Sequence, residues 1–263
     1  MTGRADRRTD RALLLTFDDR HVREWAATAP LFARYDARVT FFVCEPDRLD
    51  RDETRLLRRL ADDGHTVGCH GLRHERAPDF VAAHGAGAYL EREVVPALES
   101  LRRLGFPARS FAYPCSARDG TTDRLLLALF ERLRGGVPVD RRADPTLADE
   151  LRVPAAELSA RRVLPGCSVD SGRGAVAYED DLTGVVAALR RTADVGGVTT
   201  LYAHCVAEAH EANHVTPARL ERLLALAGEL SLPCVGFDEL PRTASPPHPP
   251  IRETLPSCMT TAH

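Results

Sequence analysis

The stretch from Leu13 to Arg20, LLLTFDDR, most constrains the fold, because an apolar run ends there in two adjacent carboxylates. Three leucines followed by Thr16 and Phe17 are typical of a strand buried on both faces in a parallel sheet. Asp18 and Asp19 then lie at the C-terminal end of the strand, where α/β folds place their functional groups. Adjacent strand residues point to opposite sides, so the two carboxylates can have different roles. The alternative is an ordinary helix N-cap or solvated turn.

Strands and helices alternate along the chain. The predicted strands, rich in β-branched and aromatic residues, are Ala12–Phe17, Ala37–Val43, His65–Cys69, Arg109–Ser116, Gly135–Val139, Arg162–Pro165, Val198–Ala203 and Leu232–Phe237. The predicted helices are Val22–Tyr35 with a kink or split at Pro30, one through Leu56–Leu60 ending at Gly64, one ending at Leu104, Leu125–Leu133 capped by Thr121 or Thr122, Asp180–Thr192, and one opened by Thr216 and Pro217. This order predicts an α/β fold with seven or eight parallel strands, either doubly wound or closed as a (β/α) barrel.

The side chains that follow these strands favour the barrel. They are Asp18 and Asp19 after the first strand, His70 and His74 after the third, Tyr113–Ser116 after the fourth, and His204 after a late one. Groups so far apart in sequence meet most directly at the mouth of a barrel. Two histidines at i and i+4, with a carboxylate from another strand, can hold a divalent metal. On its own, the histidine pair is equally compatible with ordinary loop residues.

Together these groups predict a hydrolytic site. A divalent metal held by Asp19, His70 and His74 would activate water and polarise a carbonyl, and the free carboxylate of Asp18 would take a proton during attack. His204 is the candidate acid for the leaving nitrogen, because imidazolium donates protons near neutral pH.

Composition excludes several other classes. A net charge of -3 offers no excess positive charge for nucleic acid or membrane binding. All 35 residues counted as Lys or Arg are Arg, which excludes Schiff-base, lysine-anchored PLP and Walker-type phosphate chemistry. The sequence shows no secretory signal or membrane span, and its seven cysteines contain no CxxC pair, so a cytoplasmic location with reduced thiols is expected.

The 263 residues suit one large domain. We expect a flexible N-terminal tail over residues 1–10, a catalytic domain over 11–240 and a Pro-rich disordered tail over 241–263. The polar segment Asp140–Ala160 leaves a homodimer open.

Five motifs, in order and spacing, resemble the polysaccharide deacetylase family, the NodB-homology group of carbohydrate esterase family four. They are TFDD at 16–19, VTFFV at 39–43, HGLRH at 70–74, FAYPCS at 111–116 and LYAH at 201–204. The similarity spans Arg11 to Leu240. It implies a distorted (β/α) barrel that hydrolyses an N-acetyl amide with one divalent metal ion, for which Zn²⁺ is expected.

By position, the resemblance implies Asp18 as base, Asp19, His70 and His74 as metal ligands, and His204 as acid. Cys115 stands where the family commonly has a tyrosine whose backbone N–H helps to hold the oxyanion, a role that does not depend on the side chain. Tyr113 and Pro114, with the nearby cations Arg20 and Arg118, are predicted to contact substrate.

The chain departs from the family pattern at several positions. Arg20 replaces the usual glycine, Gly71 replaces Ser or Thr, and Ala112 replaces an arginine that orients the base. Arg20 or Arg118 is a candidate to fill the place of that arginine. Asp170 is a candidate for the weakly defined fourth motif, with a surface loop as the alternative.

Cys69 and Cys205 adjoin His70 and His204. As neighbours in a strand they should point away from the site, and unpaired Cys is usually a small buried hydrophobe. We therefore predict that both pack in the core.

The expected substrate is a small N-acetylated, or N-formylated, sugar or other metabolite. Five Tyr and one Trp give no sign of a long aromatic-lined glycan groove, and the arginines near the site suit an anionic substrate. Two alternatives remain. One is a hydrolase of the same fold acting on a cyclic imide or ureide. The other is a non-catalytic small-molecule or glycan binding protein, for which the missing arginine is the hint.

Overall fold

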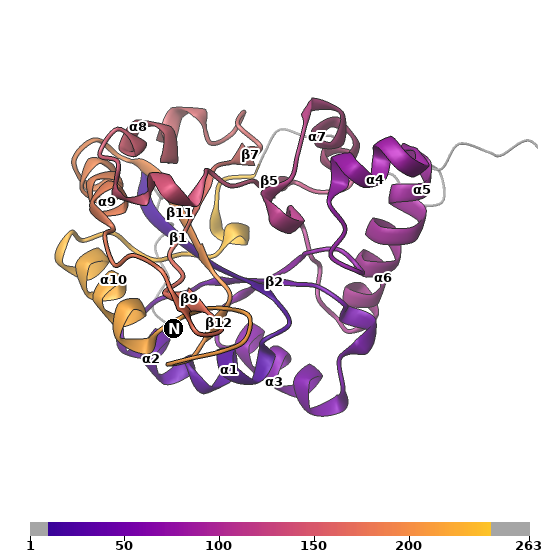
Figure 1. The fold of residues 1–263 in the computed structure, drawn as a ribbon, viewed down its shortest axis with the longest axis horizontal. Helices are drawn as coiled ribbons and strands as arrows, with labels where there is room; N and C mark the ends of the chain where they lie inside the picture. Colours follow the sequence, from indigo (N-terminus) through magenta and orange to yellow (C-terminus); the bar gives the residue numbers. More distant parts are fainter. Residues whose placement is uncertain (1–9, 243–263) are drawn as a thin grey trace, which may run out of the picture.

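The central strand is β1 (Arg11–Asp19), whose residues from Ala12 to Asp18 are all buried. The computed structural model describes residues 10–242, and in them β1 pairs in parallel with β11 (Gly197–Ala203) on one side and β2 (Thr40–Val43) on the other. Helices pack outside this sheet (Figure 1). The strand predicted around LLLTF is therefore confirmed, and it runs on through both aspartates.

The main sheet has the order β6-β11-β1-β2-β3-β4-β5-β7, with β8 also paired to β11. Its remaining members are β3 (Thr66–Cys69), β4 (Ser110–Ala112), β5 (Arg132–Arg134), β6 (Arg152–Val153), β7 (Val163–Leu164) and β8 (Gly166–Ser168). All pairs in it are parallel except β6 with β11. This barrel-like, mostly parallel sheet confirms the predicted fold class.

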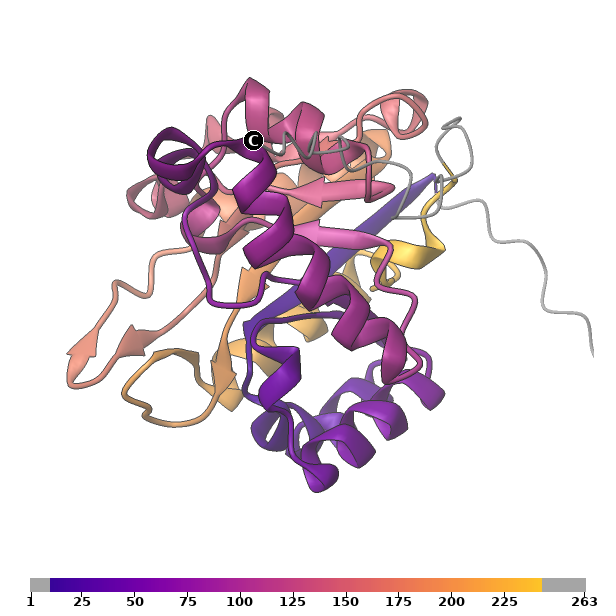
Figure 2. The same ribbon diagram turned by 90° about the vertical axis from the view of Figure 1, so that its right-hand side faces the viewer.

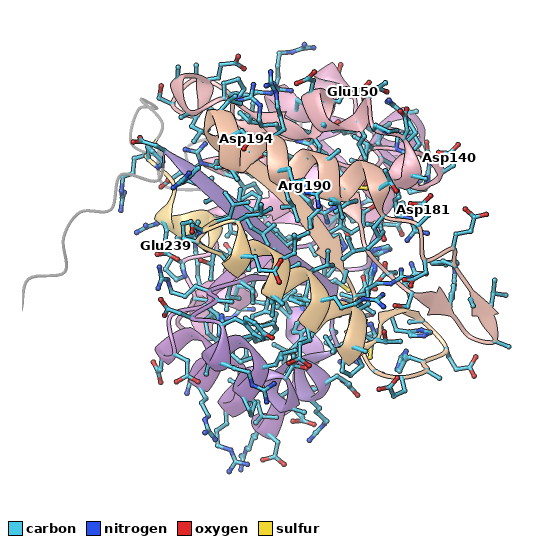
Figure 3. All side chains as sticks on the ribbon, turned by 90° about the vertical axis from the view of Figure 1, so that its left-hand side faces the viewer. Asp140, Glu150, Asp181, Arg190, Asp194 and Glu239 are labelled. Atoms are coloured by element: carbon cyan, nitrogen blue, oxygen red, sulfur yellow. The ribbon has the colours of Figure 1, made fainter. Side chains whose placement is uncertain are left out.

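The helices form an outer layer. They are α1 (Val22–Ala27), α2 (Ala29–Arg34), α3 (Arg51–Asp62), α4 (Ala77–His84), α5 (Ala86–Tyr89), α6 (Val95–Arg103), α7 (Gly120–Leu127), α8 (Leu147–Leu151), α9 (Thr183–Val195) and α10 (Pro217–Glu229). Figure 3 shows α9 and α10 crossing one face, with the labelled Arg190 and Asp194 of α9 on its outer side. The opposite side of α9 buries Val185 and Leu189, so its apolar residues face the core.

A second, smaller sheet has the order β10-β9-β13-β12. Its strands are β9 (Gly172–Arg173), β10 (Val176–Ala177), β12 (Cys205–Val206) and β13 (Asn213–Val215). Figure 2 shows the β9–β10 hairpin extending outward from the body of the molecule. Since β12 follows β11 after a single residue, this sheet is built directly onto the end of a central strand.

Several predicted boundaries are confirmed. The helix predicted from Val22 is split, and the second piece, α2, has Pro30 in its first turn, where a missing N–H costs nothing. Helix α3 ends just before Gly64, whose φ of +99° ends the helix in a conformation that glycine adopts readily.

Three predicted elements are wrong. The helix predicted over Leu125–Leu133 is α7, and it starts earlier because the Asp119 carboxylate accepts hydrogen bonds from the N–H groups of Thr121 and Thr122. Residues Arg132–Arg134, at the end of this predicted helix, form strand β5. The described residues show no strand over 135–139, where one was predicted. Leu232–Phe237 makes only an isolated bridge, between Cys234 and Leu13.

The single helix predicted to end at Leu104 is broken into α4, α5, a π-helical turn over Leu90–Val94, and α6. The predicted tails, at 1–10 and 241–263, fall almost wholly outside the described residues. Within residues 10–242, no helix combines the length and the apolar character needed to cross a membrane.

Candidate active site

The C-terminal ends of several parallel strands meet at one edge of the main sheet. Phe17 of β1 is the register partner of Ala203 of β11, and Asp19 is the partner of Val43 on β2. His204 is the residue that follows β11, and His70 is the residue that follows β3. The sheet therefore brings together groups from distant parts of the sequence, as the strand pattern predicts.

Asp19, His70 and His74 form a compact set whose ligand atoms all lie within 4.8 Å of one another. Asp19 Oδ1 is 3.6 Å from His70 Nε2 and 3.3 Å from His74 Nε2. The Ala112 carbonyl oxygen, 2.8 Å from His70 Nδ1, can only accept a hydrogen bond. Nδ1 therefore carries the ring proton and Nε2 has a free lone pair. One carboxylate and two imidazole nitrogens suit zinc, so these residues fit a divalent metal ion.

The protonation states of these side chains also suit a metal. Burial lowers the pKa of His70 to about 4, which keeps its imidazole neutral. For Asp19, burial acts to raise the pKa, but the surrounding histidines, His70, His204 and His74 foremost, lower it overall. A neutral imidazole and an ionised carboxylate are the forms that bind metal.

A buried carboxylate holds the loop that carries His74. Glu93, in the π-helical turn, accepts hydrogen bonds from the backbone N–H groups of Arg73 at 2.9 Å and Glu75 at 3.1 Å. Gly71 has a φ of +86°, and a Cβ there would lie 2.4 Å from Glu93 Oε1. The glycine is thus needed for the loop to approach Glu93, which braces the loop through these two hydrogen bonds.

Asp18 forms a buried ion pair with Arg134 of β5, through Oδ2 and Nη2. The side chains of Asp18 and Arg134 are 3% and 1% exposed. The guanidinium also stacks over the ring of Tyr202, with its central carbon 4.3 Å from the ring centroid. Asp18 Oδ1 is buried without a hydrogen-bond partner among the described residues, so this oxygen can accept a hydrogen bond.

Arg134 supplies the guanidinium that is absent at position 112. Ala112 and Arg134 are register partners on neighbouring parallel strands, so a guanidinium reaches the Asp18 carboxylate from the neighbouring strand. The expectation that Arg20 or Arg118 fills this place is wrong. Arg20 donates to the Arg48 carbonyl oxygen at 2.9 Å, and Arg118 pairs with Asp123.

Arg134 is not among the predicted site residues, because it lies between the helix predicted to end at Leu133 and the strand predicted to begin at Gly135. The available signal was the alternation Arg-Leu-Arg at 132–134 directly before two glycines, which is a short strand pattern that ends in a turn.

His204 is held by Asp170, which is 1% exposed, so the surface-loop interpretation of Asp170 is wrong. The His204 backbone N–H donates to Asp170 Oδ1 at 3.1 Å, and Nδ1 lies 2.7 Å from Oδ2. Burial alone would lower the pKa of His204, but the carboxylates of Asp170, Asp18 and Asp19 raise it to about 9. His204 is therefore a cation at neutral pH, and with Nδ1 bound to Asp170 its Nε2 is the nitrogen available to a substrate.

These groups line one cavity of about 410 Å³. Its walls are Asp18, Asp19, His70, His74, Tyr113, Cys115, Ser116, Arg173, Tyr202, His204, Ala212 and Asn213. Of the predicted substrate contacts, Tyr113 is in this wall, whereas Pro114, Arg20 and Arg118 are not. Arg173 of β9, which was not predicted, is the arginine that lines it.

A larger cavity of about 630 Å³ lies near the start of β3, beside His65 and Thr66. This is the opposite end of the strand from His70. We therefore place the candidate active site in the smaller cavity, which contains the converging aspartate and histidine side chains.

Cys69 and Cys205 are both fully buried, and neither lines the substrate cavity. This agrees with the prediction that they point away from the site. Cys205 is not surrounded by apolar groups alone, however, because its sulfur lies close to His21 and His210.

A family model described as polysaccharide deacetylase matches residues 5–129. The chitin deacetylase from the fungal pathogen Colletotrichum lindemuthianum has a similar fold, with a TM-score of 0.54 and 16% identity over 89% of this chain and 88% of that chain. A peptidoglycan N-acetylglucosamine deacetylase gives a TM-score of 0.54 and 14% identity over 89% of both chains. A search of curated protein sequences found no match. The sequence match over residues 5–129 and the similarity of the fold together confirm the resemblance to the polysaccharide deacetylase family that was drawn from the motifs.

Proposed function

We propose that this protein is a metal-dependent hydrolase that removes an N-acetyl group from a small sugar. The observation that carries the proposal is the convergence, in one cavity, of a three-residue metal set with two separately held proton-transfer groups. Asp18 is paired with the cation Arg134, and His204 with the carboxylate Asp170. The two groups are therefore held in opposite charge states, as a base and an acid must be.

The roles of the residues follow from these contacts. Asp19, His70 and His74 would hold a divalent ion, with zinc as the expected metal, which when bound supplies Lewis acidity to the substrate carbonyl and to water. Asp18 Oδ1, free of hydrogen bonds, accepts the proton of the attacking water, while Arg134 fixes the carboxylate through Oδ2. His204 Nε2 then donates its proton to the leaving nitrogen, and Asp170 stabilises the charged ring before the transfer.

Cys115 is proposed to help hold the oxyanion through its backbone N–H. It lines the cavity with a φ of 54°, an uncommon conformation for a residue other than glycine and one often found at functional sites. Tyr113 contributes to the wall and is fixed by donating its hydroxyl hydrogen to Asp123 Oδ1 at 2.9 Å.

The size of the cavity supports a small substrate. A volume of about 410 Å³ lies toward the lower end of the range for small-molecule sites. Arg173 and Asn213 of the small sheet, together with Ala212 directly before β13, line one side of the cavity. Arg173 would favour a substrate with a negative charge. A cytoplasmic location and a homodimer stay predictions.

Of the two alternatives, the binding protein loses its main support. It depended on the missing arginine, and Arg134 provides a guanidinium on the same carboxylate. The cyclic imide or ureide alternative is tested by the same substrate panel as the deacetylase.

The test measures acetate release from N-acetylglucosamine, its phosphorylated form and short N-acetylglucosamine oligomers. In parallel it measures formate release from N-formyl substrates and ring opening of cyclic imides. We expect activity on the N-acetylated monosaccharides that a chelator abolishes and zinc restores. His74→Ala should lose both metal and activity, whereas His84→Ala, at an exposed position on α4, should keep both. Turnover that is unaffected by both metal removal and His74→Ala would exclude the mechanism. Preference for the cyclic imide would instead exclude the proposed substrate class.

A further inference from the structure

A second group of metal-ligating side chains lies beside the first. His21 is the residue before α1, Cys205 is on β12, and His210 is in the loop between β12 and β13. Their ligand atoms all lie within 4.8 Å of one another. None of the three lines the substrate cavity. Helix α1 and strand β12 are in contact, which brings the groups together from separate parts of the sequence (Figure 1).

His21 has an unused coordinating atom. Its Nε2 is buried and has no hydrogen-bond partner among the described residues. The nearest acidic oxygen is Asp19 Oδ2, at 3.9 Å, which is too far for a hydrogen bond. A buried polar atom without a partner is uncommon and unfavourable, and an ion is one of the explanations to be sought for it.

The ligand types and spacing fit a soft divalent cation. Two imidazoles and a thiol are ligands for zinc, with Zn–N bonds of about 2.0 Å and Zn–S bonds of about 2.3 Å. Around a tetrahedral ion with such bonds, two nitrogen ligands lie roughly 3.3 Å apart, and a nitrogen and a sulfur ligand lie roughly 3.5 Å apart. A contraction of at most about 1.5 Å from the separations in the structure would therefore complete the site.

We infer that His21, Cys205 and His210 form a second divalent-metal site, with Asp19 Oδ2 facing it as the fourth group. Asp19 would then stand between two ions, because its Oδ1 faces His70 and His74. The second ion would be structural. It would fasten the loop before β13, which supplies Ala212 to the cavity wall, to the start of α1.

Binding requires one local rearrangement. His210 Nδ1 accepts a hydrogen bond from the Ala212 N–H at 3.0 Å. A metal on Nδ1 would displace this amide, whereas a metal on Nε2 would leave Nδ1 with the ring proton. Either way, the hydrogen bond is exchanged for a metal bond.

Cobalt titration tests this site separately from catalysis, because only a thiolate ligand gives an intense sulfur-to-cobalt absorption in the near ultraviolet. The chelator-treated protein should bind about two Co²⁺ ions per chain and develop this absorption. Cys205→Ala should bind one ion fewer and lose the absorption. Cys234→Ala, at a buried cysteine beside Leu13 on β1, is the matched control and should behave like the unaltered chain.

Two further variants keep the test decisive. His74→Ala should lose one ion but keep the sulfur absorption, so failure of the first site is distinguishable from failure of the second. His210→Ala, in a loop, should weaken binding of the sulfur-linked ion at least about tenfold even if Cys205→Ala does not fold. Absence of the absorption in the unaltered chain, or its persistence in Cys205→Ala, would overturn the inference.

Discussion

The two halves of the chain contribute differently to the site. The N-terminal half, which contains the family match at residues 5–129, supplies Asp18 and the three metal-binding candidates, and its central strand β1 is nine residues long. The C-terminal half supplies Arg134, Asp170 and His204 from strands of three to seven residues and the loops after them. The first half thus provides the proposed metal ligands, and the second half sets the charge and orientation of the proposed proton-transfer groups. Variants in the two halves should therefore separate metal binding from proton transfer.

The largest effect is expected at Asp18, the proposed base, which lies in the first half and pairs with Arg134 of the second half. Asp18→Asn removes the proton acceptor, and kcat should fall by about 10²- to 10⁴-fold. Metal content should be unchanged, because Asp18 is outside the three-ligand group. Steady-state kinetics and elemental analysis measure both quantities.

Asp62→Asn, at an exposed position on α3, is the control and should match the unaltered protein. Loss of metal in Asp18→Asn would show that Asp18 contributes to metal binding, which contradicts the proposed separation of metal binding from proton transfer.

Arg134→Met tests the contribution of the second half to stability. Removing one partner of a buried ion pair leaves the other charge unpaired, which should lower the free energy of unfolding by about 3 to 5 kcal/mol. Urea denaturation measures this loss. The double variant Arg134→Met, Asp18→Asn should recover much of it, since no buried charge is left. If the double variant is as unstable as Arg134→Met, the stabilisation comes from packing on Tyr202 and not from the ion pair.

Asp170→Asn should move the alkaline limb of the pH–rate profile. The pKa of His204 is raised to about 9, so the acid is protonated at neutral pH and its activity falls as pH rises through about 9. Without the Asp170 carboxylate this pKa falls. A return to about 6.5 would lower activity roughly 30-fold at pH 8. Metal content should not change.

The same pKa shift predicts a change in stability. Because the pKa is raised in the folded state, the His204–Asp170 pair stabilises the fold fully below about pH 6.5, and the contribution is lost as pH rises to about 9. An alkaline limb that stays in place in Asp170→Asn would assign that limb to another group.

The smallest effect is expected in the first half, at the brace of the metal loop. Glu93→Gln should lower the free energy of unfolding by about 1 to 3 kcal/mol, because an amide in place of the carboxylate cannot accept all the N–H groups that point at it. Zinc affinity should fall about 10-fold as the loop carrying His74 loosens. Glu91→Gln, exposed in the same turn, should change neither quantity. Equal effects of the two substitutions would show that Glu93 does not position the loop.

The sequence predicted the first half well because each signal there is local. An apolar run that ends in two aspartates identifies a buried strand and its functional end, and His70 and His74 follow the next but one strand directly. The parallel class, the split at Pro30 and the end of α3 at Gly64 follow from similarly short patterns.

The second half was harder because its determinants are tertiary. A strand of three residues, such as β5, has too few residues to show a periodic pattern, so Arg134 fell between a helix predicted to end at Leu133 and a strand predicted to begin at Gly135. Asp170 is recognisable as a partner of His204 only when β8 is placed beside β11. Likewise, nothing in the local sequence around Cys205 indicates that His21 lies next to it.

The pairing of Ala112 with Arg134 has a consequence for how function is inferred from motifs. A signature that requires arginine at position 112 would score this chain as defective, although a guanidinium arrives at the same carboxylate from the neighbouring strand. What such a site needs is a positive charge at a point in space, and two adjacent strands offer interchangeable places from which to supply it. Searches for active members of this family should therefore accept an arginine at either of the two register partners.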